Sequence, residues 1–137
     1  MQPTENILEE LKMDLWAGVN MNKRIAARIY SAKPERIIYT ICELAVKNDN
    51  RWISRDEIHS ALEEDLWDFI IPGKKWNPVD WFSSNYTRVE KNIYGAAKNT
   101  ITRWVPVLLR RKRGKYEYRI RDEYFPYIKE LIQEMRK

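Results

Sequence analysis

The sequence predicts a mainly α-helical fold with one small β-hairpin near its end. Two observations carry this prediction. Apolar residues recur at helical spacing through most of the chain, whereas residues 115–121, just after Gly114, alternate between apolar or aromatic and charged side chains with a period of two. The chain has 137 residues, of which 44% are hydrophobic and 33% are charged. This length and composition fit one globular domain with a single core.

The first helix is predicted over residues 5–17, with Gly18 as its stop. Its apolar residues have helical spacing, at Ile7, Leu8, Leu11, Leu15 and Trp16. A shorter pattern predicts a second helix over 22–30. Pro34 suits the first turn of a third helix, whose apolar stripe continues to about Lys47.

A capping box marks the start of the next helix. The Ser54 hydroxyl can accept from the amide three residues on, and Glu57 can return the bond to the Ser54 amide. Ile53 before the cap and Ile58 after it have the spacing of a hydrophobic staple. We expect this helix to continue to about Glu64, with its acidic residues on the outer face.

Residues 66–82 form an apolar connector that contains three tryptophans, Trp67, Trp76 and Trp81. Their indoles could stack on nucleic-acid bases, but we favour packing in a core or interface because aliphatic residues surround them. Asn77 followed by Pro78 has the pattern of a helix start. We therefore expect an extra short helix over 78–83.

A second capping box, from Thr87 to Glu90, predicts a helix over 87–104. One side of this helix is apolar. The other side carries cations, amides and a hydroxyl, at Arg88, Lys91, Asn92, Lys98, Asn99 and Thr102. Such groups can hydrogen-bond base edges in a DNA major groove. Gly95 on the same side costs about 1 kcal/mol in a helix interior, and close approach to a partner or tight packing against another helix would explain it.

Pro106 is predicted to end that helix, and two strands follow over 107–111 and 115–120. Between them, Gly114 can supply the positive φ of a tight hairpin. The hairpin is rich in cations, which repel one another unless an anion neutralises them: Arg110, Arg111, Lys112, Arg113 and Lys115. A last helix is predicted over about 123–136.

Charge is unevenly distributed along the chain, whose formal net charge is +5. Residues 103–121 contain eight basic residues and one acidic residue, which gives +7. Residues 56–68 contain six acids and no Lys or Arg, which gives −6. A concentrated positive segment is the electrostatic pattern expected of a protein that binds a polyanion.

The sequence also argues against several classes of protein. No apolar run approaches the roughly 18–20 residues of a membrane helix, and we expect neither a signal peptide nor a membrane partner. One cysteine, Cys42, and one histidine, His59, exclude a disulfide framework and a Cys/His metal cluster. We interpret Cys42 as a small core residue and expect an intracellular location, in the cytoplasm or nucleoid.

No catalytic signature is present in the sequence. It has no Gly-rich phosphate loop and no nucleophile elbow. The acids of residues 56–68 could hold Mg²⁺ as in a nuclease, but a solvated acidic helix face explains them better. We therefore expect no enzyme activity, no metal and no cofactor.

From residue 34 onward, the elements follow the order helix, short extended segment at Trp52–Ile53, helix, connector, helix and basic hairpin. This order resembles the winged helix-turn-helix family of DNA-binding proteins. On this resemblance, residues 1–33 are an N-terminal helical extension, residues 34–121 the winged-helix core and residues 122–137 a C-terminal helix. The connector over 65–86 is a departure, because the family usually joins these two helices by a short turn.

The resemblance implies a duplex DNA-binding protein that regulates transcription, with general or sequence-specific binding. Helix 87–104 would enter the major groove and the wing, 107–120, would lie on the backbone. The implied groove-facing residues are Arg88, Lys91, Asn92, Lys98, Asn99 and Thr102. The implied wing cations are Arg110, Arg111, Lys112, Arg113 and Lys115.

Two other functions remain open at this point. The acidic face and the indoles could make a protein-interaction module from the same fold. The tyrosines and tryptophans could stack on the bases of RNA. The first and last helices carry apolar stripes, which predict a homodimer; the alternative is that both helices pack on the core of a monomer.

Overall fold

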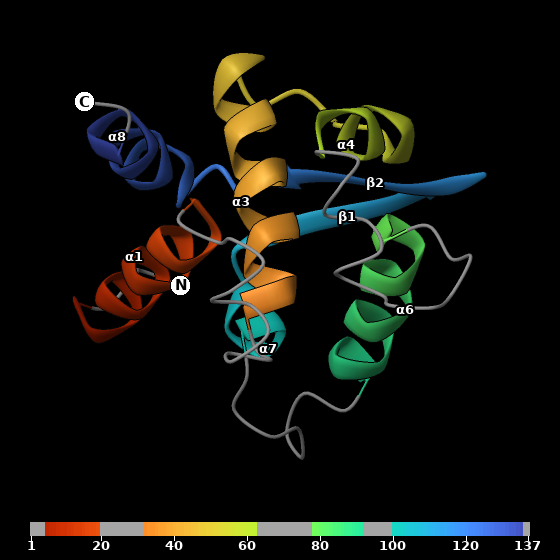
Figure 1. Cartoon of the computed structure of the whole chain (residues 1–137), viewed down its shortest axis with the longest axis horizontal. Coiled ribbons are helices and arrows are strands. Elements are labelled where there is room, and N and C mark those ends of the chain that lie inside the picture. The colour runs from red at the N-terminus through yellow and green to blue at the C-terminus, as the bar shows by residue number, and fades with distance from the viewer. Residues whose placement is uncertain (1–4, 20–31, 63–77, 92–99, 136–137) are drawn as a thin grey trace.

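The computed structural model describes residues 5–19, 32–62, 78–91 and 100–135 (Figure 1). The described elements, in chain order, are α1 (Glu5–Val19), α3 (Ala32–Lys47), α4 (Arg55–Ala61), α6 (Pro78–Lys91), α7 (Thr100–Trp104), β1 (Leu108–Arg113), β2 (Lys115–Ile120) and α8 (Phe125–Met135). The predicted fold class, mainly α-helical with a small hairpin, is confirmed. The helix predicted over 22–30 lies outside the described residues, as do Trp67 and Trp76.

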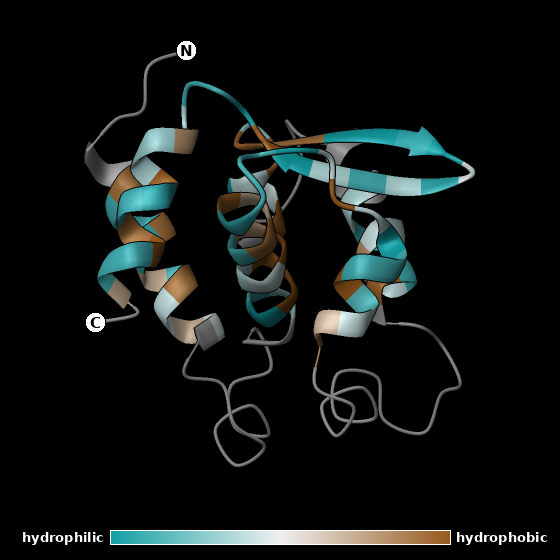
Figure 2. Cartoon of the chain, turned by 90° about the horizontal axis from the view of Figure 1, so that it is seen from above, coloured by the Kyte–Doolittle hydropathy of each residue, from teal (hydrophilic) through white to brown (hydrophobic). Residues whose placement is uncertain are grey.

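Helix α3 is the centre of the fold. Helices α1 and α8 lie on one side of it, and α4 and α6 lie on the other (Figures 1 and 2). Its apolar stripe is fully buried, at Ile37, Ile38, Ile41, Cys42 and Ala45. The interpretation of Cys42 as a core residue is therefore confirmed. None of the helices in the described ranges is long and apolar enough to cross a membrane.

Helix α1 shares the core with α3, since Leu11 and Leu15 are fully buried between them. The predicted stop at Gly18 is wrong by one residue, because α1 continues to Val19. Gly18 instead allows the two helices to approach. A Cβ built at this position would clash with the Glu35 carbonyl and would lie 2.8 Å from the Cβ of Tyr39.

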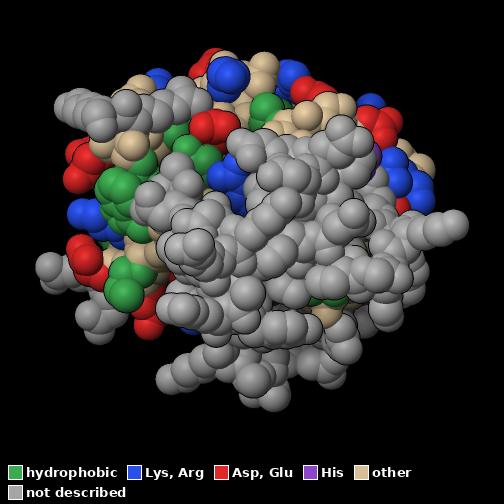
Figure 3. Space-filling model, viewed as in Figure 1, with side chains coloured by type: hydrophobic (Ala, Val, Ile, Leu, Met, Phe, Trp, Pro, Cys, Tyr) green, Lys and Arg blue, Asp and Glu red, His purple; other side chains and the backbone are tan. Residues whose placement is uncertain are grey.

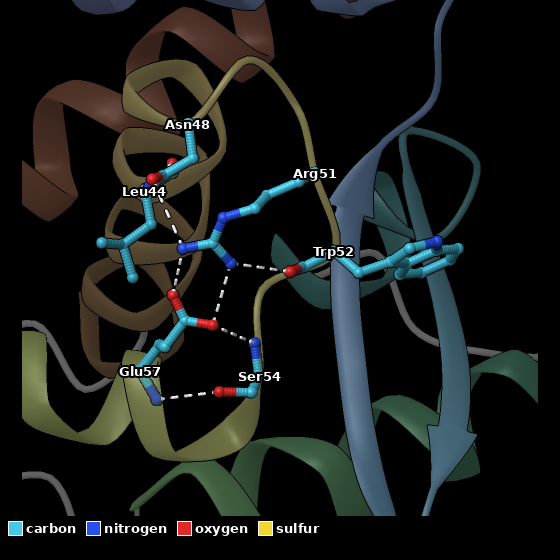
Figure 4. A network of polar contacts seen from close by, with 6 residues as sticks. All are labelled: Leu44, Asn48, Arg51, Trp52, Ser54 and Glu57. Carbon is cyan, nitrogen blue, oxygen red and sulfur yellow. Dashed lines mark hydrogen bonds and ion pairs between the residues drawn. The ribbon is translucent and has the colours of Figure 1, made fainter.

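Helix α4 begins at the predicted capping box. The Ser54 hydroxyl accepts from the Glu57 amide (3.2 Å), and the Glu57 carboxylate accepts from the Ser54 amide (3.3 Å). Arg51 also donates to this carboxylate (Figure 4). The helix ends at Ala61, earlier than the predicted Glu64, because Leu62 has an extended backbone, with ψ 137°.

Helix α6 corrects two predictions. The expected short helix over 78–83 and the expected start of another at Thr87 are wrong, because one helix runs from Pro78 to Lys91. The Thr87 hydroxyl donates to the carbonyl of Ser83 one turn earlier (2.9 Å), so it does not cap a new helix. The predicted helix over 87–104 is therefore divided between α6 and α7, with residues 92–99 outside the described ranges.

The hairpin forms close to its predicted position. Strands β1 and β2 pair antiparallel from Leu108↔Ile120 to Arg113↔Lys115, and Gly114 joins them with a φ of +73°. Ile53 exchanges two backbone hydrogen bonds with Tyr118, at 2.8 and 3.0 Å. The predicted extended segment before α4 thus adds one paired residue to the edge of β2. Hydrophilic residues occupy most of the hairpin (Figure 2).

Helix α8 returns the chain to α3 and α1. Its buried residues are Ile128, Leu131 and Ile132, with Tyr124 buried just before the helix. The first and last described helices therefore contribute to the same core as α3.

Candidate nucleic-acid interface

The tip of the hairpin forms two clefts with neighbouring helices. The larger cleft, about 510 Å³, lies between the tip and α6, with Arg55 of α4 at its border. The smaller cleft, about 410 Å³, lies between the tip and the start of α4. Arg55 and Lys115 line both clefts. The hairpin tip, α4 and α6 thus form one continuous surface.

Buried aromatic residues hold α6 against the hairpin. The rings of Phe82, Tyr86 and Tyr118 lie 5.7–5.8 Å apart in tilted and edge-to-face arrangements. The hydroxyls of Ser83 and Tyr118 are hydrogen-bonded at 2.8 Å. Burial raises the pKa of Tyr118 to about 12, so this phenol stays protonated at neutral pH. The position of the hairpin relative to α6 is therefore fixed by packing.

Arg110 connects the hairpin to α6. Its guanidinium donates to the Thr87 hydroxyl (2.6 Å) and to the Ser83 carbonyl (3.3 Å). It also lies over the ring of Tyr116, at 4.1 Å, and near that of Tyr86, at 5.0 Å. Arg110 was predicted as a wing cation, and the structure gives it these contacts within the protein.

Arg111 is also engaged within the protein, on the other face of the hairpin. Its guanidinium donates to the Glu117 carboxylate (2.6 Å) and lies over the Trp52 ring at 4.4 Å. Arg119 lies near the same indole, at 5.6 Å, and donates to Asp122 (2.7 Å). These contacts balance the charges of Arg111 and Arg119 locally.

The three remaining tip cations, Lys112, Arg113 and Lys115, are exposed. Among the described residues, no carboxylate lies within ion-pair distance of any of them. The nearby acids have other partners, since Asp80 and Asp56 bind Arg55. The end of the hairpin is therefore a positively charged surface, and Asp80, which lines the same cleft as Lys112 and Lys115, is already paired with Arg55.

The predicted groove-facing residues do not form one group in the structure. Arg88 and Lys91 belong to the last turns of α6, whereas Thr102 is half-buried in α7. Helix α7 lies next to the start of β1, at the end of the hairpin opposite its tip (Figure 1). Asn92, Lys98 and Asn99 lie outside the described residues.

Several residues at this surface carry no signal in the sequence that marks them as site residues. They are Arg55, Asp80 and Ser84, which the fold brings to the hairpin tip. Arg55 forms a bidentate pair with Asp80, at 2.8 and 2.9 Å. This pair lowers the pKa of the Asp80 carboxyl. The two residues are 25 positions apart, and no local pattern indicates that they meet.

The described residues give little support to metal binding or to a nucleophilic cysteine. They contain no group of three or more His, Cys, Asp or Glu side chains arranged to hold a metal. Burial raises the pKa of the Cys42 thiol, which disfavours the nucleophilic thiolate.

Comparison with models of known protein families, with curated proteins and with solved structures finds no match to this chain.

Proposed function

We propose that this protein binds duplex DNA through the hairpin tip and α6, and that it acts as a regulator of transcription. The observation that carries the proposal is the exposed cationic tip, formed by Lys112, Arg113 and Lys115, on a hairpin anchored to a helix. Cations at phosphates supply affinity and release counterions, while side chains at base edges supply selectivity. This function requires access to DNA, and we therefore propose an intracellular location.

The helix proposed to enter the major groove is α6, and not the helix predicted over 87–104. Helix α6 packs directly beside the hairpin and shares the larger cleft with its tip. It also contains Arg88 and Lys91, two of the residues expected to face the groove. We therefore assign the groove-facing role to α6, in place of a helix over 87–104. The order α3, Ile53, α4, α6 and hairpin retains the resemblance to a winged helix-turn-helix.

A salt series tests the proposal. Binding of a fluorescent random duplex is measured by anisotropy from about 50 to 300 mM salt, where log affinity falls linearly with log salt. Replacing Lys112 and Lys115 by Ala should reduce the slope by about 2, because each phosphate contact contributes about 0.9. The control variant K47A/K129A removes two exposed lysines on other helices and should keep the slope. Equal slopes for the two variants would contradict the proposal.

Competition with RNA distinguishes the alternative polyanion. Recognition of single-stranded RNA depends on aromatic rings that are free to stack on bases. The tip's ring, Tyr116, is already covered by Arg110 at 4.1 Å, and Trp52 is covered by Arg111 at 4.4 Å. We therefore expect duplex DNA to displace a bound duplex more effectively than single-stranded RNA of equal length.

We also propose that α1 and α8 mediate a homodimer. Two large apolar side chains on α1 are exposed, Met13 by 71% and Trp16 by 39%. Hydrophobic side chains lie beside acidic ones on this side of the molecule (Figure 3). Sedimentation of M13E should show a monomer if α1 is the interface. Deleting α1 is a poorer test, because Leu11 and Leu15 belong to the core.

A further inference from the structure

We propose that the larger cleft, between the hairpin tip, α4 and α6, is a binding site for one phosphate group. Its ligands are the ammonium groups of Lys112 and Lys115, the Arg55 guanidinium and the Ser84 hydroxyl. The phosphate site itself does not depend on the proposed function. Only its natural ligand, which we take to be a phosphate of the DNA backbone, rests on that function.

The charge of the cleft favours an oxyanion. Three cations, Arg55, Lys112 and Lys115, line it, together with one carboxylate, Asp80, so its formal charge is +2. Arg55 binds both oxygens of Asp80, at 2.8 and 2.9 Å. The carboxylate is therefore neutralised by a fixed partner, and the two lysines supply the excess positive charge.

Hydrogen-bond donors remain available for a ligand. The guanidinium of Arg55 has five N–H groups. Its hydrogen bonds to Asp80 and Asp56 use three of them, one on each nitrogen. Ser84 is exposed and lines the cleft, so its hydroxyl is a second available donor. A phosphate oxygen is a strong acceptor for both kinds of donor, and such charge-assisted bonds are stronger than neutral ones.

The walls of the cleft are held in place before any ligand binds. The Arg110–Thr87 hydrogen bond (2.6 Å) fixes the hairpin to α6, and the Arg55–Asp80 pair fixes α4 to α6. Gly114 closes the hairpin with a positive φ and leaves open space around its Cα. A volume of about 510 Å³ readily accommodates a phosphate group. Preorganisation of this kind reduces the entropy lost on binding.

Titration with inorganic phosphate tests the site directly. Amide signals of the uniformly ¹⁵N-labelled full chain are followed while sodium phosphate replaces sodium chloride at constant ionic strength and pH. We expect saturable shifts at Ser84, Gly114 and Lys115. In K115A the affinity should fall by about tenfold, from loss of one charged contact. In S84A it should fall by a smaller factor, and in the control K129A it should not change.

The possible results separate this inference from the proposed function. If the chemical-shift changes rise linearly with phosphate concentration and do not saturate, the phosphate site is wrong. It is also wrong if K115A and K129A bind phosphate with equal affinity. If the duplex binds but inorganic phosphate does not, the site is wrong and DNA binding stands. If phosphate saturates the site but the duplex does not bind, the site stands and its phosphate belongs to a free small ligand. All three variants replace exposed side chains, and their spectra report directly whether the fold is retained.

Discussion

The side chain of Asn50 pairs with the backbone of Ile120 through two buried hydrogen bonds. Its amide donates to the Ile120 carbonyl (2.7 Å) and accepts from the Ile120 amide (2.9 Å). Asn50 has a φ of 60°, a left-handed conformation that Asn tolerates better than most residues. The side chain thereby takes the place of a neighbouring strand at the end of β2.

Replacing Asn50 by Ala should destabilise the fold by about 2–4 kcal/mol. The change leaves the Ile120 amide and carbonyl buried without these partners, and it places Ala at an unfavourable φ. Chemical denaturation with urea measures the loss. Q133A removes an exposed side-chain amide on α8 and should stay within about 0.5 kcal/mol of the original protein. A similar small loss in N50A would show that the pairing contributes little.

The capping box at Ser54 should make stability depend on pH in the acid range. The Arg51 guanidinium lowers the pKa of Glu57 to about 2, from an ordinary value of 4.5. Because this pKa is lowered in the folded state, the stabilisation is complete above about 4.5 and is lost as the pH falls towards about 2.

Thermal unfolding between pH 5 and pH 2 tests this dependence, and its temperature midpoint should fall less steeply in E57Q. Glutamine can still accept from the Ser54 amide but does not titrate. E123Q, which replaces an exposed carboxylate, should keep the original pH profile. If both variants follow the same profile, Glu57 is not the group responsible.

Replacing Asp14 by Asn should cost about 2–3 kcal/mol, because it removes the charge from a nearly buried ion pair. The Asp14 carboxylate accepts from Arg103 (2.8 and 3.1 Å) and from the indole of Trp104 (3.2 Å). Glu10 provides a matched control, since it lies 3.8 Å from the same Arg103 but is largely exposed. E10Q should change the free energy of unfolding by less than about 0.5 kcal/mol.

Replacing Arg110 and replacing Lys112 should have different effects on stability and on DNA binding, although both residues are cations of β1. R110A should lower the free energy of unfolding by about 1–2 kcal/mol, through loss of its hydrogen bond to Thr87 and its contact with Tyr116. K112A should leave stability unchanged and should reduce the salt slope of duplex binding by about 0.9. Equal stability of the two variants would contradict the anchoring role of Arg110.

Local patterns predicted the features whose causes are local. The Ser54–Glu57 box and Gly114 were recognised because a helix cap and a hairpin turn depend on residues within a few positions. The same kind of pattern failed at Thr87. There α6 continues because Phe82 and Tyr86 pack against Tyr118, and a residue in a distant strand decides the outcome.

The candidate site was predicted only in part for the same reason. Sequence charge identified the cationic hairpin, but it could not separate Arg110 and Arg111, which the fold engages, from the exposed Lys112, Arg113 and Lys115. Arg55 and Asp80 meet across 25 positions, and Asn50 meets Ile120 across 70. Neither pair has a signal in a single sequence.

The ion pair between Asp14 and Arg103 has a consequence for synthesis on the ribosome. The two residues are separated by 89 positions, and chains elongate at about 5–20 residues per second. For several seconds, the nascent N-terminal helix therefore exists without the cation that neutralises its innermost carboxylate. The native attachment of this helix is completed only after the chain has been translated as far as Arg103.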